Sequence, residues 1–205
     1  MIFATPLVRY GPLSPCQTTC VGMFLRACER ILDAAEGFCI YNDAGIAVQD
    51  LRVRRLLGDD EHVLIVDVDA HHGNGNAHVF LKDERVVVLD IYNGDFYPNS
   101  PSTKRRVDVG IPLKSGTLGA DYRAKLRDGL ELLQSGARLA FVVAGTDVFA
   151  SDPVGALGLS IEQCAKRDRL VFSRFKALGV PAVFLAGGGH GKDSARHDRR
   201  KGGMS

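Results

Sequence analysis

The sequence predicts an α/β fold with three layers, α-β-α, in which a mainly parallel β-sheet lies between two layers of helices. Four predominantly apolar runs, at residues 62–68, 85–91, 139–144 and 180–186, have the length and the β-branched content of buried strands. Helical periodicity fills much of the sequence between them. Continuous apolar strands that alternate with helices indicate a parallel sheet covered on both faces.

Three segments have the apolar periodicity of amphipathic helices, and a fourth has it weakly. Residues 44–57 and 120–133 each place apolar side chains on one helical face. Ser160 opens a further helix, with a glutamine three residues later that completes a capping box, and Gly179 ends it. Residues 21–35 show only a weak amphipathic pattern, and we expect a short helix there.

Composition predicts one soluble domain in a reducing compartment. With 205 residues and 45% hydrophobic content, the chain is long enough for one buried core. Charges of both signs are interspersed and the net charge is +2, so we expect neither a nucleic-acid surface nor a membrane surface. Five cysteines, an odd number without paired spacing, favour a cytoplasmic location over a disulfide framework.

The stretch from Val63 to Gly75 organises the chain, because a buried strand there ends in a cluster of carboxylates and imidazoles. It reads V-L-I-V-D-V-D-A-H-H-G-N-G. Since side chains alternate faces along a strand, Asp67, Asp69 and His71 should point to one side. In the alternative interpretation, the acids cap a turn and the histidines lie on a surface loop. His72 is equally well explained as a packed histidine that supports the backbone.

Polar residues also follow the other three predicted strands. The second run ends at Asp90, the third is followed by Asp147, and the fourth by three glycines and His190. In parallel sheets ligands bind outside the carboxyl ends of the strands, so these residues should meet at one edge. Asp69, His71 and Asp147 together could supply the three protein ligands of a catalytic zinc site with one open position.

The motif Asp-x-Asp-x-His-His-Gly-Asn-Gly at residues 67–75 strongly resembles the metal-binding motif of the histone deacetylase family. Its members are zinc-dependent acyl-lysine amidohydrolases that are related in fold to arginase. With I-Y-N at residues 91–93, the motif is most similar to the smaller, class IV-like deacetylases and their bacterial relatives. The resemblance implies an arginase/deacetylase-like fold, here incomplete, and zinc ligation by Asp69, His71 and Asp147.

The resemblance also implies roles for residues around the zinc. Asp67 and Asp90 would support the ligands or hold a monovalent cation such as K⁺. His190 follows the glycine run, at the position where most family members carry the tyrosine that stabilises the transition state. An imidazole can also donate a hydrogen bond, but its reach differs from that of a phenol, so the resemblance implies a less efficient site.

Three further residues match the substrate channel of the family. Phe38, Tyr97 and Gly188 would line a narrow apolar tube around the stem of an acylated lysine or of an acetylated small amine. Such a tube suits a neutral acylated amine better than a free ammonium, whose charge would have to be desolvated. In the alternative interpretation, Phe38 and Tyr97 are ordinary core aromatics.

The largest departure from the family concerns proton transfer. The family uses an adjacent pair of histidines shortly before the Gly-Phe-Cys motif found here at residues 37–39. The six histidines of this chain lie at positions 62, 71, 72, 78, 190 and 197, so the pair is missing. We therefore expect a truncated or frame-altered member, with a divergent segment at 1–36, a partial deacetylase domain at 37–195 and a basic tail at 196–205.

Three other functions are compatible with the sequence. The first is a hydrolase of the same fold that acts on acetylated polyamines or other amides. The second is a dinuclear, arginase-like site, which the metal stoichiometry would reveal. The third is a catalytically inactive metal-binding or interaction protein, which the missing histidine pair favours.

Overall fold

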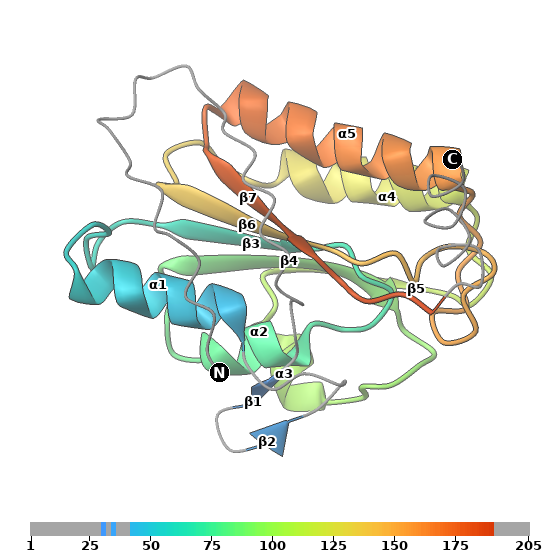
Figure 1. Cartoon of the computed structure of the whole chain (residues 1–205), viewed down its shortest axis with the longest axis horizontal. Helices are drawn as coiled ribbons and strands as arrows, with labels where there is room; N and C mark the ends of the chain where they lie inside the picture. Colours follow the sequence, from blue (N-terminus) through green and yellow to red (C-terminus); the bar gives the residue numbers. More distant parts are fainter. Residues whose placement is uncertain (1–29, 32–33, 36–41, 191–205) are drawn as a thin grey trace, which may run out of the picture.

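The computed structural model describes residues 30–31, 34–35 and 42–190, and its central feature is a five-stranded parallel sheet (Figure 1). The strands are β3 (Val63–Asp67), β4 (Val86–Asn93), β5 (Val109–Leu113), β6 (Leu139–Ala144) and β7 (Ala182–Ala186). Their order across the sheet is β5-β4-β3-β6-β7, and all neighbouring pairs are parallel. The motif-bearing strand β3 is therefore central.

Helices cover both faces of this sheet. α4 (Gly119–Glu131) and α5 (Ile161–Leu178) lie on one face, at the top of Figure 1. α1 (Asp43–Val53), α2 (Asn74–Val79) and α3 (Pro101–Arg106) lie on the other side. One apolar core packs the sheet against α4 and α5, and a second packs it against α1. The predicted three-layer α-β-α fold is confirmed.

All four predicted strands are present, and their ends differ from the predicted ends by at most two residues. The fifth strand, β5, was not predicted. It contains Gly110 and Pro112, two residue types that are depleted in strands, and it lies at an edge of the described sheet. Only Leu113 of its five residues is buried, so β5 lacks the apolar run that marks the central strands.

Local sequence sets the ends of the predicted helices. Both hydrogen bonds of the Ser160–Gln163 capping box are formed at the start of α5, and Gly179 ends this helix in the left-handed conformation with φ of 68°. α1 begins after Asn42, whose side chain accepts a hydrogen bond from the backbone N–H of Gly45 at 2.6 Å.

Two short helices and one short strand pair were not predicted. Asparagine and glycine in α2 have low helix propensity, and α3 has only six residues. The prediction of a helix at 21–35 is wrong for residues 30–31 and 34–35, which are the part of that segment that the structure describes. There, β1 (Arg30–Ile31) pairs antiparallel with β2 (Ala34–Ala35), and β1 lies against α2. Strand pairing and packing outweigh the weak helical pattern.

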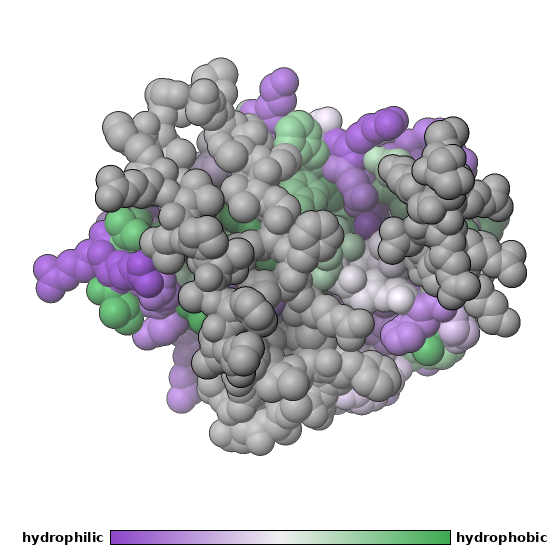
Figure 2. All heavy atoms as spheres, viewed as in Figure 1, coloured by the Kyte–Doolittle hydropathy of each residue, from purple (hydrophilic) through white to green (hydrophobic). Residues whose placement is uncertain are grey.

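Polar and apolar side chains are unevenly distributed over the face shown in Figure 2. Green, apolar atoms gather near the middle of this view, where β6 and β7 run in Figure 1. Val183 and Phe184 of β7 are half-buried and pack at the margins of the two cores.

No helix in the described part of the chain combines the length and the hydrophobicity that crossing a bilayer requires.

Candidate metal centre

The two central strands, β3 and β6, bring three potential metal ligands together at the carboxyl edge of the sheet. β3 ends at Asp67, and the loop after it carries Asp69 and His71, whereas Asp147 lies three residues beyond the end of β6. The two strands are paired in register, so their following loops start side by side. One ligand atom from each of Asp69, His71 and Asp147 lies within 4.8 Å of the other two.

The imidazole of His71 faces both carboxylates of this triad. Its Nδ1 lies 2.9 Å from Oδ2 of Asp147 and 3.2 Å from Oδ1 of Asp69. Zinc binds nitrogen and oxygen ligands at about 2.0–2.2 Å, which puts tetrahedral ligand atoms about 3.4 Å apart. Two carboxylates and one imidazole at these separations therefore fit a zinc-sized divalent cation with small adjustments.

Hydrogen bonds to the backbone hold the triad in this arrangement. Oδ1 of Asp147 accepts from the N–H of Ala70 at 2.9 Å, which ties the two loops to each other. Oδ1 of Asp69 accepts from the N–H of His71 at 3.0 Å, and Oδ1 of Asp67 accepts from the N–H of Asp69 at 3.1 Å. The acids thus cap the turn, as in the alternative interpretation, while they also converge on one point.

The acidities of the triad depend on one another. Hydrogen bonds with Asp147 and Asp69 raise the pKa of His71 to about 10. Burial and the charge of Asp69 raise the pKa of Asp147 to about 7. Burial opposes the ionisation of Asp69, but its hydrogen bonds with His71 and Asp147 outweigh this effect and lower its pKa. The metal-free cluster therefore holds protons at the position that a divalent cation would occupy.

Two glycines allow close approach of backbone to the ligands. A Cβ atom on Gly145 would lie 2.0 Å from Oδ2 of Asp69, and one on Gly155 would lie 1.9 Å from the carbonyl oxygen of Asp147. No side chain fits at either position without moving a ligand residue. The glycines after β6 are thus part of the geometry of the site.

Asp67 of β3 and Asp90 of β4 lie opposite each other on neighbouring parallel strands. Oδ2 of Asp67 accepts from the side-chain amide of Asn76 at 3.2 Å. Oδ2 of Asp90 lies 2.5 Å from Nδ1 of His72 and accepts from the N–H of Gly73 at 3.0 Å. Burial raises the pKa of the Asp90 carboxyl. Neither residue belongs to the triad.

His72 is a packed residue that supports the backbone. It is 1% exposed, and its Nε2 lies 2.9 Å from Oγ1 of Thr103 on α3. Because that hydroxyl donates to the carbonyl of Ser100, Nε2 must donate to it. The supporting role considered for His72 is confirmed, and the ring holds the loop of His71 against α3.

Comparison with known proteins identifies the family. Residues 31–201 match the histone deacetylase domain. The chain belongs to the histone deacetylase family. "Histone deacetylase 2" of Arabidopsis thaliana is 35% identical over 162 residues, which are 78% of this chain and 41% of the relative. "Acetylpolyamine amidohydrolase" of Burkholderia pseudomallei is 28% identical over 180 residues, 82% of this chain and 50% of the relative.

Two solved structures share the fold of this chain. An acetylpolyamine aminohydrolase from Burkholderia pseudomallei superimposes with a TM-score of 0.68 at 25% identity, over 84% of this chain and 51% of the other. An HDAC homolog from Aquifex aeolicus gives 0.67 at 22% identity, over 82% and 46%. The chain spans about half the length of the curated relatives it matches. The predicted family and the arginase/deacetylase-like fold are confirmed. The family is metal-dependent, and Asp69, His71 and Asp147 form the candidate metal site of this chain.

The glycine run after β7 lies beside the Asp147 loop of this family member. The backbone N–H and the hydroxyl of Thr146 both donate to the carbonyl of Gly188, at 2.8 and 3.0 Å. The N–H of His190 donates to Oδ2 of Asp152 at 2.5 Å. Gly188 and His190 are both exposed, and they are held at the same edge of the sheet as the triad. Their assigned roles stay predictions.

The predicted channel aromatics are only partly described. Tyr97 lies in the loop between β4 and α3 and is 56% exposed, so it is not a core aromatic. Phe38 lies outside the described residues, as do most of the predicted divergent segment 1–36 and all of the basic tail 196–205. The channel and the predicted domain bounds therefore stay predictions.

Two supporting residues escaped the sequence analysis. Asp152 is buried and accepts hydrogen bonds from the N–H groups of Val154, Gly155 and His190, which joins the two loops. Arg167 is buried within α5. It could have been found from its spacing, because it lies four and eight residues before the buried Val171 and Phe175, on the apolar face of the helix.

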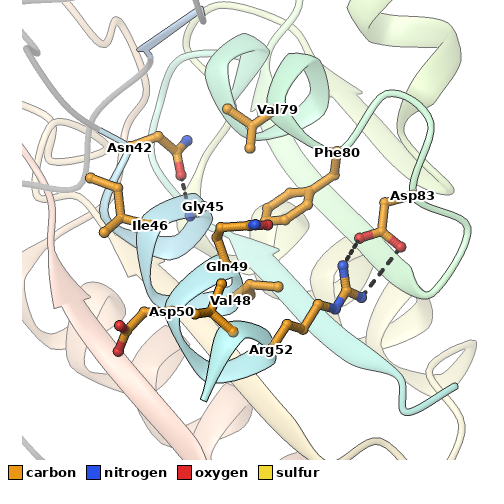
Figure 3. A pocket seen from close by; sticks show the side chains of 11 residues that line it. Asn42, Gly45, Ile46, Val48, Gln49, Asp50, Arg52, Val79, Phe80 and Asp83 are labelled. Carbon is orange, nitrogen blue, oxygen red and sulfur yellow. Dashed lines mark hydrogen bonds and ion pairs between the residues drawn. The ribbon is translucent and has the colours of Figure 1, made fainter. Parts of the chain in front are cut away.

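A cavity of about 680 Å³ lies between α1 and the end of α2, away from the triad (Figure 3). Its walls are formed by Asn42, Gly45, Ile46, Val48, Gln49, Asp50, Arg52, Val53, Val79, Phe80 and Asp83. Arg52 forms an ion pair with Asp83 at one side of it. Neither the triad nor Tyr97 or Gly188 is among the described residues that line this cavity, so it is separate from the candidate metal centre.

Proposed function

We propose that this chain carries the zinc site of a hydrolase that removes acetyl or other acyl groups from lysine side chains. The observation that carries the proposal is the convergence of Asp69, His71 and Asp147 in a member of the histone deacetylase family. Imidazole and carboxylate groups both bind zinc, and a catalytic zinc site has three protein ligands and keeps one coordination position open. A zinc ion held there would polarise an amide carbonyl and lower the pKa of a bound water.

Under this proposal, different residues bind the metal, stabilise the oxyanion and enclose the substrate. Asp69, His71 and Asp147 would hold the cation, and Asp67, which accepts from the N–H of Asp69, would orient the loop that carries two of them. His190, fixed through its backbone to Asp152, would donate a hydrogen bond from its imidazole to the oxyanion that develops at the carbonyl. Phe38, Tyr97 and Gly188 would enclose the stem of the substrate and exclude water from it.

A second candidate substrate is an acetylated small amine such as an acetylpolyamine. The acetylpolyamine amidohydrolase of Burkholderia pseudomallei matches this chain over 180 residues, and a solved acetylpolyamine aminohydrolase superimposes at a TM-score of 0.68. A free amine and a protein-bound lysine present the same acylated nitrogen. Comparing the turnover of N-acetylputrescine with that of an acetyl-lysine peptide separates the two proposals.

A third candidate is a metal-binding protein without hydrolytic activity. The observation in its favour is that no adjacent histidine pair precedes residue 37. General acid and base catalysis is typically worth about 10²- to 10⁴-fold in rate, so a site that lacks both the general acid and the general base would hydrolyse substrate too slowly to detect. Under this proposal the triad binds zinc, but bound substrate is not hydrolysed.

We also propose that Asp67 and Asp90 create a site for a monovalent cation such as K⁺. Both side chains are buried and in register on neighbouring strands, and Oδ1 of Asp90 has no hydrogen-bond partner among the described residues. A buried, unpaired carboxylate oxygen is costly unless a cation or water satisfies it. Potassium should therefore raise the thermal unfolding midpoint relative to choline at equal ionic strength, and Asp90→Asn should remove this difference.

The main test is a zinc titration of the purified chain together with hydrolysis of a fluorogenic acetyl-lysine and a trifluoroacetyl-lysine substrate. Asp147→Ala should abolish both zinc binding and any hydrolysis, whereas Asp128→Ala, at an exposed carboxylate on α4, should change neither. Zinc binding without turnover would support the inactive alternative. A native chain that binds no zinc, or an Asp147→Ala variant that binds it equally well, would overturn the proposal.

A further inference from the structure

Among residues 42–190, Arg167 is the only lysine or arginine that is buried. It lies on the inner face of α5, is 1% exposed, and shares that face with Val171 and Phe175. Removing a guanidinium from water is costly unless its N–H groups find partners. A cation at this depth therefore needs a specific set of acceptors.

The acceptors are backbone carbonyls at the ends of the two strands that precede the triad. Nη1 of Arg167 donates to the carbonyl of Val68 at 3.0 Å and to that of Gly145 at 2.7 Å. Val68 directly precedes Asp69, and Gly145 is two residues before Asp147. A single nitrogen thus connects the end of β3 to the end of β6.

The other contacts of Arg167 fix its own position. Nε donates to Oδ1 of Asp168 at 2.8 Å, and the hydroxyl of Tyr122, from α4, donates to the carbonyl of Val68 at 3.1 Å. Both helices on this face of the sheet therefore hold the same strand end. The guanidinium contacts backbone carbonyls and Asp168, whereas the ligand carboxylates are bound by other groups. Its influence on the triad must act through the position of the backbone.

We infer that Arg167 is a positioning residue that sets the separation between the strand ends carrying Asp69 and Asp147, and that tight metal binding requires it. This inference rests on the proposed metal centre. Without the guanidinium, the carbonyl of Gly145 loses the one side-chain donor it has among the described residues. The loop of Asp147 then keeps its hydrogen bond to the N–H of Ala70 but loses a contact that fixes it relative to β3, so the ligand atoms are held less precisely within reach of one cation.

The test compares metal binding by four forms of the full chain. Arg167→Met keeps an unbranched side chain but removes every donor, whereas Arg167→Lys keeps the charge and can still donate to the carbonyls. Arg174→Met is the matched control, since Arg174 lies on the same helix and donates to the carbonyls of Leu130, Glu131 and Leu133 at the far end of α4. Zinc affinity is measured by chelator competition, and Co²⁺ absorption reports the ligand geometry.

We expect Arg167→Met to weaken zinc binding at least tenfold and to shift the visible Co²⁺ spectrum, and Arg167→Lys to stay within threefold of the native chain. Arg174→Met should lower the thermal unfolding midpoint of the metal-free protein without changing zinc affinity. Zinc affinity within twofold of native in Arg167→Met, or an equal loss in Arg174→Met, would overturn the inference. A native chain that binds no zinc would instead contradict the proposed function.

A further variant keeps the test decisive if circular dichroism shows that Arg167→Met does not fold. Tyr122→Phe removes only the hydroxyl that donates to Val68 and fills the same space. It should weaken zinc binding several-fold, because the same strand end loses one of its two side-chain donors. Unchanged zinc affinity in this variant would then count against positioning of the triad from the helical layer.

Discussion

Gly145 allows the proposed metal centre to be tested with a single methyl group. In Gly145→Ala, the new Cβ atom would lie 2.0 Å from Oδ2 of Asp69, 2.7 Å from its Cγ, and 2.9 Å from Oδ1 of Asp147. Ordinary van der Waals contact begins near 3.4 Å, so the Asp69 oxygen has to move by about 1.4 Å. Zinc–oxygen bonds tolerate deviations of about 0.2 Å, so this displacement removes a ligand.

Gly145→Ala should affect both metal binding and the stability of the fold. Disturbing even the residues that orient metal ligands costs about 10- to 100-fold in affinity, and displacement of a ligand should reach at least the upper end of this range. Overpacking a closely packed site lowers the free energy of unfolding by about 1–3 kcal/mol. The variant should therefore remain folded but bind zinc about 100-fold more weakly.

The assay is zinc affinity by chelator competition, with urea unfolding of the metal-free protein measured in parallel. Gly110→Ala is the control, because a Cβ atom on Gly110 in β5 would meet only Val107, at an ordinary 3.7 Å. The control should keep native zinc affinity. If Gly145→Ala binds zinc within threefold of the native chain, the carboxylate of Asp69 is not a ligand in the geometry described.

Further predictions concern protons, caps and the core. Because His71, with a pKa of about 10, and Asp147, with a pKa of about 7, hold protons in the metal-free site, zinc binding should release about one proton at pH 8 and about two at pH 6. Zinc affinity should therefore rise with pH, and calorimetry in buffers of different ionisation enthalpy counts the protons. Ser160→Ala breaks the capping box of α5 and should lower the free energy of unfolding by about 1 kcal/mol in urea titrations. Gly179→Ala forces a side chain into a left-handed conformation at φ of 68° and should cost about 1 kcal/mol in the same assay. Leu126→Ala empties a fully buried position on α4 and should cost about 2–5 kcal/mol, whereas a value below 1 kcal/mol would contradict the described core.

The strands and the triad could be predicted because their signals are local. Each central strand is an apolar run buried on both faces, which distinguishes it from its surroundings without reference to any other segment. A polar residue directly after such a run must lie at the carboxyl edge of a parallel sheet. Asp69, His71 and Asp147 could therefore be grouped although almost eighty residues separate the first from the last.

The roles of the residues that support the triad could not be predicted in this way, because their hydrogen-bond partners are set by tertiary contacts. Arg167 belongs to no motif and does not follow a strand. Its hydrogen-bond partner, the carbonyl of Val68, lies 99 residues away in the sequence. Asp152 lies in a turn-rich loop, where a carboxylate normally indicates only a local turn. β5 was missed for a different reason: an edge strand with glycine and proline lacks the apolar run used to recognise the others.

The distribution of functional groups along the chain makes metal binding and hydrolysis separable properties. All three candidate ligands, and the described residues that position their loops, among them Asp67 and Arg167, lie within residues 42–190. The adjacent histidine pair to which the family resemblance assigns proton transfer is not contained in this sequence. Zinc affinity that responds to Gly145→Ala and Arg167→Met would therefore establish the metal centre even if no acyl substrate is turned over. Hydrolysis by the native chain that is lost in Asp147→Ala would show in addition that the site turns over substrate without this pair.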